Sequence, residues 1–352
     1  MGAAEELHKS LFGVDEAWLA RQSEPVLEPD LPIIDPHHHF WDRGGPYLFN
    51  ELLKDTRTGH NIRATVYMQC RSMYRADGPP EMACVGETEF VNGIAAMSAS
   101  GDYGPIRICE GIVGHADLLL GSRAGAVLEA QVKVGNGRFR GIRNSSVWHD
   151  DADIKGTPIS PPKGLLLDAK FHEGFAQLAP LGLSFDGWMW WTQIGEFAAL
   201  ADAFPGTNMI LDHFGGVLGI GVHIGKRDDD FTAWQKAIRD LAKRPNVSVK
   251  TGGLAMRTTG FPYREQSAPM PSSELARLWK PYFETCVEAF GADRCMFESN
   301  FPVDKVCVSY ATLWNAFKRL AQHMTAQEKS ALFFDTAARV YKLNTTPSLN
   351  AP

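Results

Sequence analysis

Short apolar runs, often rich in β-branched residues, alternate with amphipathic stretches along most of the chain. Eight of the runs have the length and composition of strands: Ile33–His37, Ala64–Cys70, Ile106–Val113, Arg138–Arg143, Leu183–Gly187, Asn208–Asp212, Asn246–Lys250 and Arg294–Ser299. The stretches between them have helical spacing, and the main ones are Met82–Ala99, Ala124–Val134, Gly164–Ala179, Ile194–Phe204, Phe231–Lys243, Ser272–Phe290 and Val303–His323. Strands that alternate with helices predict an α/β fold, a (β/α)8 TIM barrel. An open doubly wound sheet is the alternative, but no glycine-rich dinucleotide fingerprint follows any of the runs.

The two ends of the chain have a different character. Val14–Arg21 could form a short helix, and three prolines between residues 25 and 32 then favour an extended segment. Near the other end, Thr325 and Glu328 form a capping box that starts a last helix, which we expect to close one end of the barrel. The chain therefore divides into an N-terminal helix and arm (1–30), the barrel (31–343) and a tail (344–352).

The composition is that of an ordinary soluble globular protein, with 352 residues, 44% hydrophobic and 22% charged. The net charge of −6 disfavours nucleic acid or an acidic membrane surface as partner. No apolar run approaches the roughly 20 residues that span a bilayer, and the first residues lack the pattern of a signal peptide. Six scattered cysteines indicate reduced thiols in a cytoplasmic protein. We expect a small-molecule substrate, and the N-terminal arm could mediate a homodimer.

The end of the first predicted strand carries three consecutive histidines, His37, His38 and His39. Because a strand alternates its side chains between two faces, His37 and His39 should point the same way and His38 the other. Two imidazoles on one face can share a cation or a substrate oxygen. Taken alone, the pair could equally be polar core residues satisfied by hydrogen bonds.

Polar side chains also follow the other predicted strands. In a barrel the carboxyl ends of the strands converge on one mouth. The residues that should meet there, besides the histidines of the first strand, are Gln69, Glu110, His115, Arg140, Arg143, Asp186, Trp188, Asp212, His213, Lys250, Glu298, Asn300 and Asp304. A His-x-His pair, a third histidine and a carboxylate at separate strand ends either bind a divalent cation or polarise a carbonyl group.

Two further stretches are expected to shape this mouth. The long loop Ser145–Lys163 follows the fourth strand, and long loops on the carboxyl face of a barrel often line the site. The run Gly187–Trp191 holds three tryptophans. Trp188 and Trp190 either form an apolar or sugar-stacking wall of the site or pack between sheet and helix.

Four motifs, in this order, carry a family resemblance. They are Ile34-Asp35-Pro36-His37-His38-His39-Phe40-Trp41-Asp42, Phe139-Arg140-Gly141-Ile142-Arg143, Leu211-Asp212-His213-Phe214-Gly215 and Arg294-Cys295-Met296-Phe297-Glu298-Ser299-Asn300-Phe301-Pro302-Val303. The chain resembles the amidohydrolase superfamily, in its amidohydrolase-related (amidohydrolase 2) branch, over residues 33 to about 342. That branch holds sugar lactonases, 2-pyrone-4,6-dicarboxylate lactonase and, more distantly, decarboxylases.

The resemblance implies roles for particular residues. His37, His39 and His213 match positions that either bind a divalent metal, zinc or manganese, or polarise the substrate carbonyl in a metal-free site. Arg143 matches an arginine that can hold a substrate carboxylate, a task that suits its planar fork. The alternative for Arg143 is a structural ion pair with Asp186 or Glu110.

The last strand departs from the family pattern. Relatives end it with Gly-Ser-Asp, where the aspartate is the general base, whereas this chain has Glu298-Ser299-Asn300. An amide cannot take up a proton at neutral pH, so Asn300 cannot be the base. Glu298, two residues earlier on the same face, could act as base or metal ligand while Asn300 places the water. The other interpretations are a metal-activated water with Asp304 or Asp186 as base, or a loss of the hydrolytic machinery.

The expected substrate-binding residues are Gln69, Arg143, Trp188 and Arg257. Dicarboxylate lactonases carry an arginine near the position of Gly216, and its absence disfavours a doubly anionic substrate. Arg257 could still meet one carboxylate, or it could be a solvated loop charge. The favoured function is hydrolysis of a lactone or small carboxylic ester. The alternatives are a metal-dependent decarboxylase of the same superfamily and a barrel that binds a ligand without turnover.

Overall fold

An eight-stranded parallel sheet forms the centre of the computed structural model, which describes residues 13–43, 45–154 and 160–344. The strands follow the order of the sequence around the sheet: β1 (Pro32–His38), β4 (Asn61–Met68), β5 (Arg107–Gly114), β6 (Phe139–Arg143), β7 (Ser184–Gly187), β8 (Met209–Leu211), β9 (Val247–Lys250) and β10 (Cys295–Met296). Each lies within three residues of a predicted strand. A short antiparallel pair, β2 (Trp41–Asp42) and β3 (Pro46–Tyr47), follows β1.

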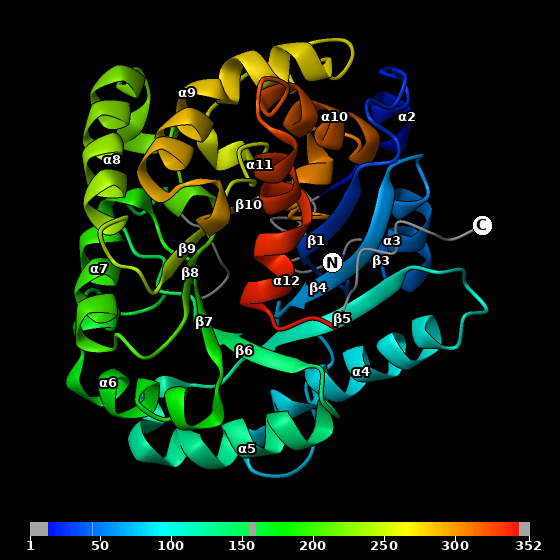
Figure 1. Cartoon of the computed structure of the whole chain (residues 1–352). Coiled ribbons are helices and arrows are strands. Elements are labelled where there is room, and N and C mark those ends of the chain that lie inside the picture. The colour runs from blue at the N-terminus through cyan, green and yellow to red at the C-terminus, as the bar shows by residue number, and fades with distance from the viewer. Residues whose placement is uncertain (1–12, 44, 155–159, 345–352) are drawn as a thin grey trace.

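The sheet is nearly closed into a barrel by contacts between its first and last strands (Figure 1). His38 forms a parallel bridge with Phe301, and the amide of His39 donates a 2.8 Å hydrogen bond to the carbonyl of Phe301. The amide of Asn300 likewise donates to the carbonyl of His37 at 2.9 Å. The last strand is shorter than predicted, because the chain after Met296 leaves the β9 ladder and continues beside β1. This closure carries Glu298 and Asn300 to the histidines of the first strand.

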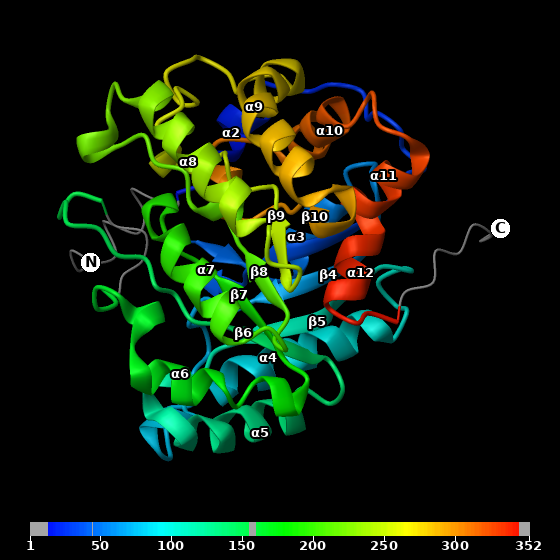
Figure 2. The same ribbon diagram turned by 60° about the vertical axis from the view of Figure 1, so that its left-hand side comes forward.

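Helices surround the sheet on its outer side, as Figures 1 and 2 show from two directions. They are α2 (Glu16–Leu19), α3 (Phe49–Thr56), α4 (Val85–Ala99), α5 (Ala124–Val134), α6 (Ala169–Phe175), α7 (Ile194–Ala203), α8 (Arg227–Leu241), α9 (Ser272–Phe290), α10 (Tyr310–Leu320), α11 (Ala326–Ser330) and α12 (Thr336–Val340). Single turns lie between them: η1 (Pro80–Met82), η2 (Leu118–Arg123), η3 (Leu165–Leu167), η4 (Ala179–Leu181), η5 (Trp191–Gln193), η6 (His213–Gly215), η7 (Gly221–His223), η8 (Arg257–Thr259), η9 (Ala292–Arg294), η10 (Asp304–Val306) and η11 (Ala331–Asp335). The strand–helix alternation confirms the predicted barrel.

Two helices have the predicted bounds, α8 begins four residues before its predicted start at Phe231, and others are shorter. α5 and α9 begin and end at the predicted residues. The helix predicted over 164–179 is reduced to α6, because the side chain of Asp168 accepts hydrogen bonds from the amides of Lys170 and Phe171 and so caps the helix there. Ser309 caps α10 in the same way, and the helix begins at Tyr310, seven residues after the predicted start at Val303.

The C-terminal helix closes the barrel at the amino ends of the strands, as predicted. Its capping box is present, since Thr325 and Glu328 exchange hydrogen bonds. Beyond a π-helical turn, η11, the side chains of Val340 and Tyr341 pack in one apolar cluster with Ile34 of β1 and other inward-facing strand residues. Burial of these side chains, at about 25 cal/mol per Å² of apolar surface, seals the floor of the barrel.

The N-terminal arm packs against the outside of the barrel from residue 13 onward, and its first twelve residues lie outside the described part of the chain, as does most of the predicted tail. The amide of Leu27 donates to Oδ1 of Asn315 at 2.8 Å, and Nζ of Lys318 donates to the carbonyl of Leu27 at 2.7 Å. The six cysteines are free thiols. Among the described helices, none has the length and apolar character that crossing a membrane requires.

Candidate active site

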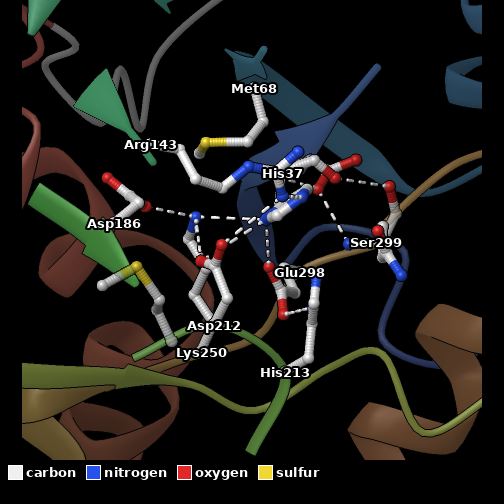
Figure 3. A network of polar contacts seen from close by, with 12 residues as sticks. His37, Met68, Arg143, Asp186, Asp212, His213, Lys250, Glu298 and Ser299 are labelled. Atoms are coloured by element: carbon white, nitrogen blue, oxygen red, sulfur yellow. Dashed lines mark hydrogen bonds and ion pairs between the residues drawn. The ribbon is translucent and has the colours of Figure 1, made fainter. Parts of the chain in front are cut away.

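The carboxyl ends of the strands bring a group of buried polar side chains together, as the sequence predicts (Figure 3). The group spans six strands and the loops that follow them, and its members are His37, His39, Arg143, Asp186, Asp212, His213, Lys250 and Glu298. We call this group the histidine–carboxylate cluster. Every member is 7% exposed or less, so its charges interact in a medium of low polarity.

Glu298 lies between two imidazoles at the centre of the cluster (Figure 3). One of its carboxylate oxygens is 2.8 Å from Nδ1 of His37, and the other is 2.7 Å from Nδ1 of His213. Burial alone would raise the pKa of Glu298, but the facing His213 and His37 rings outweigh burial and lower the pKa to about 2. The carboxylate is therefore ionised at neutral pH and accepts a hydrogen bond from Nδ1 of His213.

A backbone contact fixes the tautomer of His39. Nδ1 of His39 donates to the carbonyl of Met68 at 2.8 Å, so its Nε2 carries a lone pair. Nδ1 of His37 lies between Oε2 of Glu298, at 2.8 Å, and Nζ of Lys250, at 3.2 Å. The two Nε2 atoms lie 3.2 Å apart. Burial lowers the pKa of both imidazoles well below the ordinary value, which keeps them neutral. His38 points away and contacts Oγ1 of Thr65 at 2.8 Å, as expected for a structural histidine.

Arg143 reaches into the cluster from the end of β6. Its Nη1 lies 3.2 Å from Nε2 of His37, and its Nη2 donates to the backbone carbonyl of Gln69 at 2.6 Å. Its anionic neighbour is Asp212, at 3.5 Å, and not Asp186 or Glu110, the structural partners that the sequence suggested. Within the described residues, Nε of Arg143 and the side-chain oxygen of Gln69 are buried without a hydrogen-bond partner, so both can form a hydrogen bond with a ligand.

Lys250 occupies the centre of the barrel with no exposed surface. Its Nζ lies 2.7 Å from Asp186, 3.0 Å from Asp212 and 3.2 Å from Nδ1 of His37. Burial works against the charge of Lys250, yet the two aspartates raise its pKa above the usual value. Burial would raise the pKa of Asp212, but Lys250, His213 and Arg143 outweigh burial and lower this pKa. Burial is the dominant influence on Asp186 and raises its pKa.

The backbone around the cluster is strained in ways that the pattern of apolar residues does not reveal. His213 and Asn300 both have positive φ angles, of 54° each, a region that non-glycine residues rarely occupy. Two glycines then make room for the cluster. A Cβ atom on Gly252 would lie 2.4 Å from Cγ of Glu298, and one on Gly253 would lie 2.7 Å from the ring of His213.

Asn300 and Asp304 form a pair beside the cluster. The amide nitrogen of Asn300 donates to Oδ1 of Asp304 at 2.8 Å, and the backbone amide of Ala255 donates to the other oxygen at 3.2 Å. Burial raises the pKa of Asp304 well above its ordinary value. A carboxyl group that holds its proton cannot take one from water, which argues against Asp304 as the base.

Tryptophans form one wall next to the cluster. The ring of Trp188 contacts the ring of His213 edge-on, with centroids 5.0 Å apart. Trp188 and Trp190 share an apolar cluster with Val147 and Ile154, two residues of the long loop after β6. The loop therefore covers the wall that touches His213, although its residues 155–159 lie outside the described part of the chain.

Two arginines lie apart from these contacts. Arg140 lines a cavity of about 250 Å³ near the amino ends of the strands, together with Ser184 and Tyr341. It therefore lies at the opposite end of the barrel from the mouth where the sequence placed it. Arg257 is exposed on η8, and its guanidinium interacts with the thiol of Cys307. Its binding to substrate stays a prediction.

Three side chains are close enough to share a metal ion. One potential ligand atom from each of His37, Asp212 and His213 lies within 4.8 Å of the others. Two nitrogens and one carboxylate oxygen suit zinc or manganese, and both oxygens of Asp212 lack a well-formed hydrogen bond among the described residues. The residues therefore fit a divalent cation. The sequence had assigned His39 and Glu298 to this role, whereas this group contains Asp212, the residue directly before His213.

Comparison with known proteins places this geometry in a family. The amidohydrolase family model (Amidohydro_2) matches residues 34–343. A protein of Sinorhizobium fredii with the name "Uncharacterized protein y4mH" is 32% identical over 89% of this chain and 99% of its own length. An L-fucono-1,5-lactonase of Burkholderia multivorans is 27% identical over 88% of this chain and 96% of its own length. A crystal structure of an amidohydrolase from Burkholderia multivorans with bound zinc has a TM-score of 0.66 and 26% identity, and covers 88% of this chain and 99% of that one.

Proposed function

Because the chain belongs to the amidohydrolase family, we propose that it is a hydrolase that opens a lactone or cleaves a small carboxylic ester with water. The observation that carries the proposal is the position of Glu298 between Nδ1 of His37 and Nδ1 of His213. A carboxylate in this position makes the outward Nε2 atom of an imidazole a better proton acceptor, which is the arrangement that activates a nucleophile in many hydrolases. The lactonase name of a relative from Burkholderia multivorans supports the same class of substrate.

We assign removal of the proton to the pair of His213 and Glu298. Nε2 of His213 takes a proton from water as the water oxygen attacks the substrate carbonyl, and Glu298 balances the charge that develops on the ring. The imidazolium then returns the proton to the leaving oxygen, and the acyl–oxygen bond breaks to give an acid and an alcohol. Glu298 acting alone as the base is disfavoured, because its pKa is about 2 and each of its oxygens already contacts an imidazole nitrogen.

Other residues bind and orient the reactants. The free Nε–H of Arg143 donates to a carboxylate or hydroxyl of the substrate, and the side-chain oxygen of Gln69 accepts from a hydroxyl group. Asn300 places the water, since its amide nitrogen is fixed by Asp304. Trp188 supplies an apolar wall next to His213, and Arg257 can meet a carboxylate at the rim.

A divalent ion held by His37, Asp212 and His213, with His39 nearby, would supply Lewis-acid polarisation of the substrate carbonyl and activate the water, and His213 would then be a ligand instead of the base. The zinc in the Burkholderia multivorans structure supports this assignment. In its absence the polarisation must come from the N–H groups of the cluster, chiefly those of Arg143, which lie next to both first-strand histidines.

A panel of aldonolactones, aryl esters and hydroxybenzoic acids tests the proposal. We expect acid release from a lactone or ester, at a rate proportional to enzyme concentration, without release of carbon dioxide. Carbon dioxide from a hydroxybenzoic acid would instead identify a decarboxylase. Tight ligand binding without turnover of any compound would show a binding barrel, and either result would contradict the proposal.

A further inference from the structure

Lys250 makes contacts that resemble those of a bound cation. Its Nζ lies 3.0 Å from Oδ1 of Asp212 and 3.2 Å from Nδ1 of His37, and its third partner is Asp186 at 2.7 Å (Figure 3). The side chain is fully buried, so no water competes for its charge. A buried lysine in this position is a fixed positive charge at the centre of the barrel.

Asp212 has a cation on each side. Lys250 lies against its Oδ1, and Nη1 of Arg143 lies 3.5 Å from its Oδ2. Neither oxygen forms a well-directed hydrogen bond among the described residues. Asp212 is thus held by charge more than by hydrogen-bond geometry, and one cation can replace another beside it.

Asp212 and His37 are also two of the three side chains that can share a metal ion. A divalent ion would lie about 2.0–2.2 Å from each ligand atom. An ammonium group already lies 3.0 Å and 3.2 Å from the same two side chains. Two cations at such short separation repel strongly in a buried site, because the Coulomb energy grows as distance and polarity fall.

We propose that Lys250 is a built-in cation that competes with divalent metal ions for Asp212 and His37. Lys250 is thereby a positioning residue: it holds Asp212 in place and sets the affinity of the cluster for metal. A metal ion binds through Asp212 only when Nζ of Lys250 moves toward Asp186. Removal of the ammonium group should therefore strengthen metal binding, although it removes a polar contact from the site.

Calorimetric titration of the metal-stripped full-length protein with zinc tests the proposed competition. All proteins carry His149→Ala, since Nε2 of His149 lies 3.2 Å from Nε2 of His223 at the rim and this pair could bind zinc independently. We expect Lys250→Met to bind zinc at least about tenfold more tightly than the parent, because one positive charge next to a ligand carboxylate is removed. The matched control is Lys305→Met, which removes another buried lysine, 2.9 Å from Asp55, and should leave the affinity unchanged.

A second variant keeps the test decisive if Lys250→Met fails to fold. Lys250→Met alone leaves the carboxylate of Asp186 without its cation. The double variant Lys250→Met with Asp186→Asn removes that negative charge as well, and its zinc affinity is compared with that of Asp186→Asn alone. Circular dichroism checks that each protein is folded. Equal or weaker zinc binding in the folded Lys250 variants would overturn the proposal, and so would an equal gain in Lys305→Met. The titration needs no substrate, so its outcome does not depend on the proposed hydrolysis.

Discussion

Nδ1 of His213 donates a 2.7 Å hydrogen bond to Glu298, which joins the turn after β8 to the residues after β10 across the mouth of the barrel. His213 contributes the outward nitrogen, and Glu298 fixes the ring and its tautomer. Through this contact the proposed acid–base pair can form in a chain that has an amide, Asn300, where the family resemblance implies an aspartate base. The proposed proton transfer depends on this contact.

Replacement of Glu298 by glutamine tests that contact. An amide is neutral and cannot balance the charge that develops on the ring of His213, and its NH2 group would face one of the two Nδ1 atoms. We expect kcat to fall between about 100-fold and 10,000-fold, the range of general acid–base catalysis. The measurement is steady-state turnover of the best lactone or ester. Glu129→Gln, an exposed position on α5, is the control and should keep full activity; unchanged turnover in Glu298→Gln would contradict the assignment.

The same variant makes a prediction about stability and pH. The pKa of Glu298 in the folded protein, about 2, is below the unfolded value, so its ionised form stabilises the fold above the unfolded pKa. This stabilisation is lost as pH falls from about 4.5 toward 2, because the unfolded chain takes up a proton at this carboxylate more readily than the folded state does. The difference in free energy of unfolding between wild type and Glu298→Gln should therefore shrink over that window. Urea unfolding at several pH values measures it, and a constant difference would show that Glu298 is not held ionised.

Gly253 is predicted to be intolerant of a side chain. Its φ of 79° disfavours any L-residue, and a new Cβ would lie 2.7 Å from the ring of His213. Gly253→Ala should cost about 1–3 kcal/mol of stability through backbone strain, and should reduce turnover by displacing His213. Gly93→Ala in α4 is the matched control, because its Cβ would meet nothing within 4 Å, and it should stabilise the protein by about 0.5–1 kcal/mol. Similar stability of the two variants in urea would contradict the prediction.

Arg143 should not be replaceable by lysine. Its planar fork reaches Nε2 of His37 and the carbonyl of Gln69 at the same time, whereas an ammonium group on a flexible stem cannot hold both. We expect kcat/KM to fall by about 10- to 100-fold in both Arg143→Lys and Arg143→Met, since a hydrogen bond to a charged group contributes about 1.5–3 kcal/mol. Arg138→Lys, directly before β6, is the control, because it makes the same substitution outside the cluster and should keep wild-type kcat/KM. Wild-type kcat/KM in Arg143→Lys would show that charge alone is sufficient.

The order of strands and helices could be predicted from the sequence because the strands are short apolar runs and most of the longer helices between them have helical spacing of apolar residues. The ends of several elements could not, since they depend on single caps such as Asp168 and Ser309. The break after Met296 was also missed, because residues 297–301 keep a strand-like composition while pairing with β1 through Phe301.

The candidate site was only partly predictable for a related reason. Alternation along one strand places His37 beside His39, and barrel topology brings His213 and Glu298 toward them. Which side chains then pair depends on the stagger between strands and on local backbone strain, and neither can be read from one chain. The contact of Lys250 with Asp212, and the positive φ of His213, are consequences of this kind. The glycine pair at 252 and 253 was the one available signal for the strained region.

Hydrolysis in water enriched in oxygen-18 tests the central claim most directly. If His213 and Glu298 activate water to attack the carbonyl, the acid released by the wild-type enzyme should carry one solvent oxygen per turnover. Its rate of formation should fall by about 100- to 10,000-fold in Glu298→Gln. Product that forms without solvent oxygen, or labelled product that forms equally fast in Glu298→Gln, would contradict the account.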